Sequence, residues 1–199
     1  GLHVPTRGFV FDDFSPASSI IRNIRFAEEV CRGVIPAAVV IETDEPRTIL
    51  REKYIRKALQ VTQVLRSRPW IGKVDSLTDF LTKLWKETAG AEAGLLPKEE
   101  ADLAQLLRVL EVAGVEDFSQ RFVSKDLKSL QVKFRMFDRE SVAGSEALNQ
   151  LREHLKALEE PGIKLRLTGT AVMIFGAYQT ILDSLFLSYV GVLVVTILI

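Results

Sequence analysis

Four short stretches of the chain have the patterns of β-strands. The clearest spans residues 128–137, where apolar and polar side chains alternate, and residues 163–167 alternate in the same way. A period of two is typical of a strand with one buried and one solvent-facing side. The β-branched run 36–43 and the brief apolar run 71–75 complete the set. In 128–137 the predicted buried residues are Leu130, Val132, Phe134 and Met136, and the predicted outward residues are Gln131, Lys133 and Arg135.

Apolar residues recur at steps of three and four between these strands, and this spacing predicts amphipathic helices. We expect one helix over 17–32, one from the Asp44–Pro46 stretch to about Arg68, and one over 142–158. Shorter helices are expected from 76 to about 84 and around 103–110. Ser76 and Asp79 have the spacing of a capping box, which predicts that a helix begins directly after Ser76.

The order of these elements predicts the fold class. Strand 36–43, a helix, strand 71–75, an insertion, strand 128–137, a helix and strand 163–167 follow the β-α-β-β-α-β order of a split βαβ unit. We therefore predict an α+β, ferredoxin-like domain over 36–168, with a mainly helical insertion over about 76–126. Residues 1–35 are expected to form an N-terminal extended segment and a helix, and residues 169–199 a terminal helix.

The hydrophobicity of the chain is concentrated at its C-terminal end. Residues 169–199 contain one charged side chain, Asp183, and the 16 residues from 184 onward contain none. A bilayer-spanning helix needs about 20 mostly apolar residues. Because the apolar run continues to the last residue, we expect one continuous helix, about 46 Å long, that enters a membrane and is truncated by the boundary of the sequence. The alternative is a buried helix or strand of a soluble protein.

Twelve apolar side chains after Asp183 are expected to be embedded in the membrane. An acidic side chain at the mouth of a membrane helix needs a partner or water, and we favour a position at the interface for Asp183 over a functional pair. The embedded residues are expected to be Leu185, Phe186, Leu187, Tyr189, Val190, Val192, Leu193, Val194, Val195, Ile197, Leu198 and Ile199.

The charge and the rare residues of the chain exclude several classes of protein. Because 26 Lys and Arg balance 26 Asp and Glu, a dedicated nucleic-acid binder is disfavoured. One cysteine, Cys31, and two histidines, His3 and His154, disfavour a disulfide framework and a zinc site. For the Asp12–Asp13 pair a solvated turn is favoured over a cation site. Glycine-rich phosphate loops and a nucleophile elbow are absent from the sequence, so we expect no enzyme, no cofactor and no metal.

The insertion carries more apolar side chains than a short surface excursion needs. This surplus either thickens the core, contacts another subunit or domain, or lines an apolar groove for a ligand between the sandwich and the insertion. The sequence alone slightly favours the thickened core. The candidate residues for a hydrophobic substrate path or contact are Leu77, Phe80, Leu81, Leu84, Trp85, Leu103, Leu106 and Leu107.

Three segments together resemble one family of transporters. Residues 36–46 are similar to the early strand and helix of extracytoplasmic domains in the RND (resistance-nodulation-division) superfamily, in its branch of MMPL-like and hopanoid-exporter-like lipid transporters. Residues 74–81 resemble that branch's recurring V-x-S-L-x-D-x-L segment, and residues 164–172 resemble its junction between a strand and the second membrane helix. The order and spacing of the segments agree, so the resemblance covers roughly residues 12–199.

The resemblance implies a proton-driven exporter of hydrophobic or lipid-like substrates in the cell inner membrane. Residues 36–168 would be its periplasmic porter domain, and 169–199 the start of the following membrane helix. Acidic residues in later helices drive transport in this family, and those helices lie outside the chain, so no energy-coupling residue is carried over. The partners expected are membrane lipid, a hydrophobic or amphiphilic substrate, and further copies of the chain or adaptor proteins, with no nucleic acid.

Two other classes of protein remain open. One is a membrane-anchored binding or assembly module, such as a sensor domain or a subunit of a secretion complex. The other is a soluble enzyme with a buried apolar C-terminal element. The hydropathy of the complete gene separates them: about a dozen spanning segments support the transporter, one or two support the anchored module, and none supports the enzyme.

Overall fold

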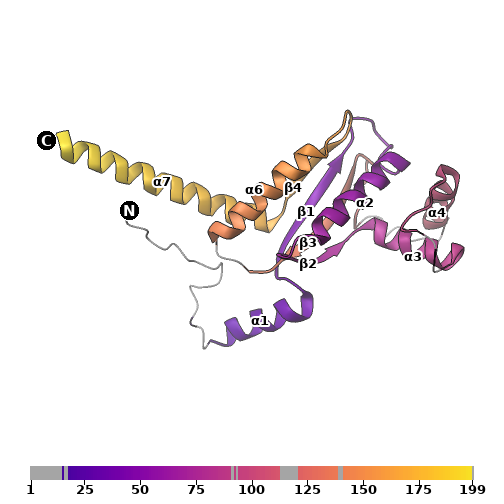
Figure 1. Cartoon of the computed structure of the whole chain (residues 1–199), viewed down its shortest axis with the longest axis horizontal. Helices are drawn as coiled ribbons and strands as arrows, with labels where there is room; N and C mark the ends of the chain where they lie inside the picture. Colours follow the sequence, from indigo (N-terminus) through magenta and orange to yellow (C-terminus); the bar gives the residue numbers. More distant parts are fainter. Residues whose placement is uncertain are drawn as a thin grey trace.

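The computed structural model describes residues 15, 18–90, 92, 94–112, 121–138 and 141–198. His3, Asp12, Asp13 and Ile199 lie outside these described residues. The elements along the chain are α1 (Ser19–Cys31), β1 (Ile35–Glu42), α2 (Glu52–Arg66), β2 (Ile71–Asp75), α3 (Leu77–Ala89), α4 (Glu100–Val112), β3 (Ser129–Met136), α6 (Ser141–Ala157), β4 (Lys164–Thr168) and α7 (Thr170–Leu198). Figure 1 shows a sandwich of strands and helices from which α7 projects.

The four predicted strands form one antiparallel sheet in the order β2-β3-β1-β4. Strand β1 lies at its centre, with Val39 opposite Val132 of β3 on one side and opposite Leu167 of β4 on the other. This order, with β1 and β3 central and β2 and β4 at the edges, confirms the α+β split βαβ fold. Residues 36–43 and 163–167 belong to the same sheet, as expected.

One face of the sheet is buried and the other is open. Alternate side chains of β1 and β3 share a single core with the apolar faces of α2 and α6, so both helices cover the same side. Lys73, Lys133 and Arg166 stand exposed on the opposite side. The central core residues include Val39, Ile41, Ala58, Val61, Leu65, Leu130, Val132, Leu148, Leu151 and Leu155. The alternation predicted for 128–137 is confirmed.

Helix α2 begins at Glu52, so the prediction that it begins in the Asp44–Pro46 stretch is wrong. The Thr48 hydroxyl donates a hydrogen bond to the carbonyl oxygen of Glu45 at 2.8 Å, and the Glu45 N–H donates to the Thr43 hydroxyl at 3.1 Å. The buried Tyr54 hydroxyl lies 2.6 Å from that of Thr43. Side-chain bonds to the local backbone compete with helix formation, and they hold residues 43–51 as a turn.

The insertion lies at the β2 edge of the sheet. Helix α3 begins directly after Ser76, and the capping box between Ser76 and Asp79 is present as predicted. Trp70 is buried in the core, and Trp85 is half-buried against it. In Figure 1, α3 and α4 stand on the side of the sheet away from α7. The insertion and the C-terminal helix therefore occupy opposite edges of the sandwich.

Helix α7 is continuous from Thr170 to Leu198, which confirms the prediction of one unbroken helix. Its 29 residues span about 44 Å at 1.5 Å per residue. Gly169 connects β4 to α7 with φ +107°, a conformation that favours glycine. A Cβ at Gly169 would come within 2.7 Å of the Cα of Ala37. The strand and the helix thus join through a tight turn against β1.

Candidate functional site: the apolar helix and the cavity at its root

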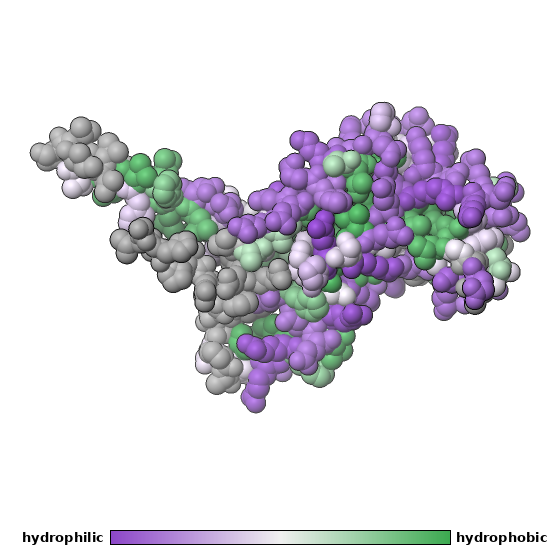
Figure 2. Space-filling model, viewed as in Figure 1, coloured by the Kyte–Doolittle hydropathy of each residue, from purple (hydrophilic) through white to green (hydrophobic). Residues whose placement is uncertain are grey.

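Helix α7 is apolar around its whole circumference, and protein covers little of it. Its segment Thr170–Val190 is long and apolar enough to cross a membrane, and it is the one such span among the described residues. The exposed fractions of Phe186, Leu187 and Tyr189 are 72%, 73% and 77%. Figure 2 shows this hydrophobic surface on the projecting helix, beside a largely hydrophilic domain. A helix that is hydrophobic all round is typically buried in a core or in a membrane, and α7 is not buried in its own domain.

The structure places the residues predicted to be in a membrane on this helix. Six of them have exposed side chains: Leu185, Phe186, Leu187, Tyr189, Val190 and Val192. Another five lie in the same helix: Leu193, Val194, Val195, Ile197 and Leu198. Ile199 lies outside the described residues. Their insertion into a membrane stays a prediction.

Several polar side chains of α7 form hydrogen bonds within the helix. Four hydroxyls each donate a hydrogen bond of 2.8–3.0 Å to the carbonyl oxygen four residues earlier. Asp183 accepts a hydrogen bond of 3.1 Å from the Gln179 side chain, one turn away. Internal satisfaction suits a helix in lipid, where no water is present to bond free polar groups. The four hydroxyl donors are Thr180, Ser184, Ser188 and Thr196.

The first turns of α7 are anchored in the domain. Ala171 and Phe175 are fully buried in the core that α2 and α6 share with the sheet. The Ser145 hydroxyl of α6 donates a hydrogen bond to the Phe175 carbonyl oxygen at 3.2 Å. The start of α7 is therefore packed against α6 and β1 and is part of the folded domain.

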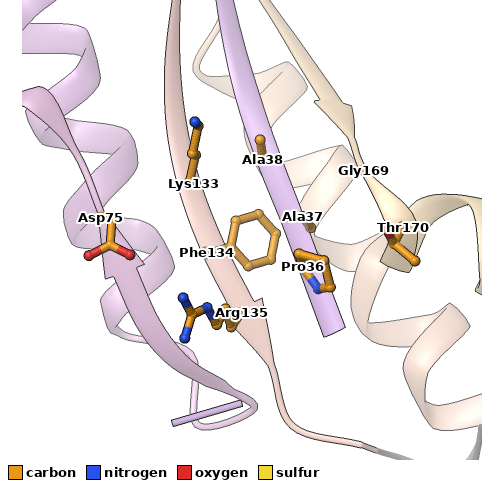
Figure 3. Close-up of a pocket in the computed structure, with 9 residues that line it drawn as sticks. All are labelled: Pro36, Ala37, Ala38, Asp75, Lys133, Phe134, Arg135, Gly169 and Thr170. Atoms are coloured by element: carbon orange, nitrogen blue, oxygen red, sulfur yellow. The ribbon is translucent and has the colours of Figure 1, made fainter. Parts of the chain in front are cut away.

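A cavity of about 340 Å³ lies on the open face of the sheet, where α7 begins. We call it the root cavity. Figure 3 shows its charged side chains on the β2 and β3 side and its small residues on the β1 and α7 side. Its lining residues are Pro36, Ala37, Ala38, Asp75, Lys133, Phe134, Arg135, Gly169 and Thr170. An apolar wall opposite a charged wall suits an amphiphilic ligand.

The charged wall of the root cavity carries more positive than negative charge. The Lys73 ammonium lies 3.2 Å from the Asp75 carboxylate and pairs with it. Lys133 lies over the ring of Phe122, 5.6 Å from its centroid, and Arg135 donates a hydrogen bond of 3.3 Å to the Cys31 carbonyl oxygen. Among the described residues, neither Lys133 nor Arg135 has a carboxylate partner. The two cations can therefore face an acidic group of a ligand.

The sequence identified Lys133 and Arg135 as outward-facing strand residues but gave no sign of the root cavity. Their alternate positions on one strand are a weak signal of a basic surface. The cavity itself depends on the register that brings Pro36 opposite Arg135 and on the antiparallel pairing that sets Ala38 beside Thr168. Such pairings join segments far apart in the chain, so the sequence pattern alone does not show them.

The candidate residues in the insertion divide into two groups. Leu77, Leu81, Leu103 and Leu106 are buried in the core, while Phe80, Leu84, Trp85 and Leu107 are half-buried at its edge. Leu103 and Leu107 also line a cavity of about 350 Å³ between α4 and the turn before α2. The other lining residues of this insertion cavity are Arg47, Leu50, Arg51, Glu52, Glu100, Ala104 and Arg108. Four of the eight residues thicken the core, and a ligand path stays a prediction for all eight.

A smaller cavity of about 220 Å³ lies between α6 and α7. Arg152 and Asn149 of α6 line it opposite Gln179 and Thr180 of α7. Arg152 donates a hydrogen bond of 2.6 Å to the Asn149 side chain.

Across the described part of the chain, no cluster of three or more His, Cys, Asp or Glu residues could hold a metal ion.

The fold and this site define an α+β domain of ferredoxin-like topology that is fixed to a projecting apolar helix. A scan against protein-family models and a search of curated proteins find no match to the chain.

Proposed function

We propose that the chain is the periplasmic porter domain of a proton-driven, RND-type exporter of hydrophobic or lipid-like substrates. Helix α7 is the start of a helix of the inner membrane, and the domain stands on its periplasmic side. The observation that carries the proposal is the apolar surface of α7, which its own domain leaves uncovered. Fully burying one Leu or Phe side chain contributes about 1.5–3 kcal/mol. If α7 were in water, its exposed apolar side chains would together lack several times this burial free energy.

The attachment of α7 to the domain supports a transport role. A porter domain has to move with its membrane helices, and a flexible linker would not transmit such movement. The buried Phe175 and its hydrogen bond from Ser145 tie the helix to α6. The Gly169 turn ties it to β1. This connection fits a domain that moves together with its membrane helix better than an independent domain on a flexible tether.

The root cavity supports an amphiphilic substrate with an acidic head. Lys133 and Arg135 offer charge to that head, and Pro36 and Ala38 offer an apolar surface to its chain. Because Thr170, the first residue of α7, also lines the cavity, a molecule bound here would lie beside the helix that leads to the bilayer. The substrate we propose is a lipid-like acid.

Membrane extraction of the full chain and of a shortened chain tests the anchoring. The full chain should remain in the membrane pellet at alkaline pH and dissolve only in detergent. A chain that ends at Leu182 should be soluble without detergent and keep its circular dichroism spectrum, because Ala171 and Phe175 remain. A full chain that is monodisperse in detergent-free buffer would contradict the proposal.

A membrane-anchored binding or assembly module is the second candidate function. The single candidate span among the described residues fits an anchored module as well as a fragment of a transporter. The two differ in the complete gene, where an exporter needs about a dozen spans in two similar halves and a module needs one or two. A complete gene with one span would move the conclusion to the anchored module.

A further inference from the structure

A second cavity of about 340 Å³ lies along β2, at the edge of the sheet, and the charged side chains that line it are all basic. We call it the edge cavity. Arg32 from the end of α1, Arg66 of α2 and Lys73 of β2 line it. Arg66 pairs with Asp79 and Lys73 pairs with Asp75, whereas Arg32 has no carboxylate partner among the described residues. The edge cavity therefore contains one uncompensated positive charge.

The edge cavity adjoins the root cavity. Lys73 lines the edge cavity, but its ammonium reaches the Asp75 carboxylate, which lines the root cavity. Lys73 also lies directly opposite Arg135 in the pairing of β2 with β3, and Figure 3 shows the Arg135 side chain extending from β3 toward β2. Arg135 donates its hydrogen bond to the carbonyl oxygen of Cys31, the residue before Arg32. The basic side chains of the two cavities are therefore neighbours.

Two features of this arrangement do not favour the fold. Lys73 and Arg135 are like charges directly opposite each other on adjacent strands, which destabilises a sheet. Arg32 is the C-cap of α1 and has φ +53°, a left-handed conformation that Gly or Asn adopts more easily. Since neither feature stabilises the domain, their effect is to concentrate positive charge around the two cavities.

The amount of uncompensated charge indicates what kind of head group fits. Arg32, Lys133 and Arg135 carry three positive charges that no carboxylate compensates among the described residues, and a carboxylate head would compensate only one of them. A phosphate monoester carries about −1.5 to −2 at pH 7, and a second phosphate linked to it adds roughly one more negative charge. Arginine binds phosphate oxygens through two parallel N–H donors. The balance of charge thus favours a head with two linked phosphates.

We propose that the root cavity and the edge cavity form one binding site for a diphosphate head. The inner phosphate contacts Lys133 and Arg135 in the root cavity, and the terminal phosphate contacts Arg32 and Lys73 in the edge cavity. The apolar chain of the ligand lies on the apolar wall of the root cavity. The inference rests on the proposed function, because it names the head group of the lipid-like acid proposed for the root cavity.

Isothermal titration calorimetry of the full chain, in phosphatidylcholine nanodiscs and without divalent cations, tests the two-phosphate site. The ligands are farnesyl diphosphate, farnesyl monophosphate and inorganic diphosphate, and empty nanodiscs correct for partition into lipid. Arg32→Asn removes the uncompensated charge of the edge cavity and places there a residue that tolerates the left-handed conformation. Arg47→Asn is the matched control, because Arg47 is also exposed and has φ +60°, but it lines the insertion cavity.

We expect the unchanged chain to bind farnesyl diphosphate at least about tenfold more tightly than farnesyl monophosphate, because the second phosphate adds charge-assisted hydrogen bonds. Arg32→Asn should reduce this preference to about threefold or less and leave the thermal unfolding temperature unchanged. Arg47→Asn should keep the preference. Lys133→Gln should weaken the binding of both farnesyl ligands, because each places a phosphate in the root cavity.

Other outcomes separate this inference from the proposed function. Equal affinity for farnesyl diphosphate and farnesyl monophosphate, or a preference that Arg32→Asn keeps, would overturn the two-phosphate site and leave the root cavity as a site for one acidic group. A preference lost in Arg47→Asn alone would move the diphosphate to the insertion cavity and overturn the inference. Inorganic diphosphate bound as tightly as farnesyl diphosphate would support the two-phosphate site but overturn the lipid-like substrate. No binding of any ligand would overturn both.

Discussion

The ring of Phe175 occupies the space that any side chain at position 144 would need. A Cβ built on Gly144 of α6 would lie 2.3 Å from the Cε1 atom of that ring. The ring itself is buried and has little room to move. Close contact between α6 and α7 therefore depends on a glycine on one helix and an aromatic ring on the other.

The first prediction concerns this contact. Gly144→Ala should destabilise the domain by about 1–3 kcal/mol, the usual cost of overpacking a core. Gly176→Ala on α7 is the control, because a Cβ there meets nothing within 4 Å and alanine favours a helix by up to about 1 kcal/mol. Urea unfolding of the chain ending at Leu182 measures both. Equal stability of the two variants would show that α7 is not packed against α6 in this way.

The second prediction concerns how much of α7 belongs to the folded domain. A chain that ends at Leu182 keeps Ala171 and Phe175 in the core, whereas a chain that ends at Gly169 loses both. Loss of a buried Phe side chain alone costs about 3–5 kcal/mol. We expect the shorter chain to unfold at clearly lower urea concentration or to aggregate. Identical unfolding midpoints would mean that the whole of α7 is dispensable for the fold.

The sequence predicted the elements of the fold well because each depends on a local pattern. The alternation in 128–137 defines β3, and the capping residues Ser76 and Asp79 define the start of α3 within one residue. The predicted start of α2 was wrong because the Tyr54 hydroxyl stabilises the turn around Thr43. Tyr54 lies more than two helical turns after the expected start. A pattern of apolar positions contains no information on such a bond.

The candidate site was only partly predictable. The apolar composition of 184–199 pointed directly to the part of α7 in which Phe186, Leu187 and Tyr189 are exposed, and the leucines of the insertion were recognised as a surplus. The structure shows that these leucines differ: Leu81 is buried in the core, whereas Leu107 lines a cavity. Lys133, Arg135 and Gly169 line the same cavity only because of the register of strands β3, β1 and β4, which is a property of the folded sheet.

The third prediction concerns a buried lysine between α2 and the connection from α6 to β4. The Lys57 ammonium is buried and donates to the Leu158 carbonyl oxygen at 3.0 Å, and it also pairs with Glu160. Lys57→Met keeps the length of the side chain but leaves the carbonyl without its donor, so we expect a loss of about 1–3 kcal/mol. Glu160→Gln should cost less, because Glu160 is 59% exposed and water screens it. Thermal unfolding compares the two, and a more stable Lys57→Met variant would contradict the prediction.

The fourth prediction concerns the turn that precedes β3. A hydrogen bond from the Ser124 hydroxyl, and then one from the Lys128 N–H, hold the pKa of Asp126 below its ordinary value of 3.8. A carboxyl with a lowered pKa contributes stability above its unfolded-state pKa, and the contribution is lost as the pH falls through the folded-state pKa. We expect Ser124→Ala to raise the pKa of Asp126 in an NMR titration. An unchanged Asp126 titration in that variant would rule out the hydrogen bond as the cause.

The fifth prediction compares the two cavities as sites for an amphiphile. Titration of the chain ending at Leu182 with a fluorescent fatty acid below its micelle concentration should give saturable binding. Lys133→Gln combined with Arg135→Gln should weaken this binding by roughly five- to thirtyfold, the factor that about 1–2 kcal/mol corresponds to. Lys86→Gln combined with Lys156→Gln is the control, because it removes the same charge from exposed positions on α3 and α6.

Variants of the insertion complete the comparison. Leu107→Ala and Trp85→Ala shorten half-buried side chains at the edge of the core, and Leu107 lines the insertion cavity. Both should lower the free energy of unfolding and leave the affinity unchanged if the acid binds in the root cavity. A loss of affinity in the two insertion variants, with normal binding by the Lys133 and Arg135 variant, would instead place the substrate between the insertion and the sandwich. If the affinity is equal to that of the unchanged chain in the Lys133 and Arg135 variant and in both insertion variants, neither the root cavity nor the insertion is the site of binding.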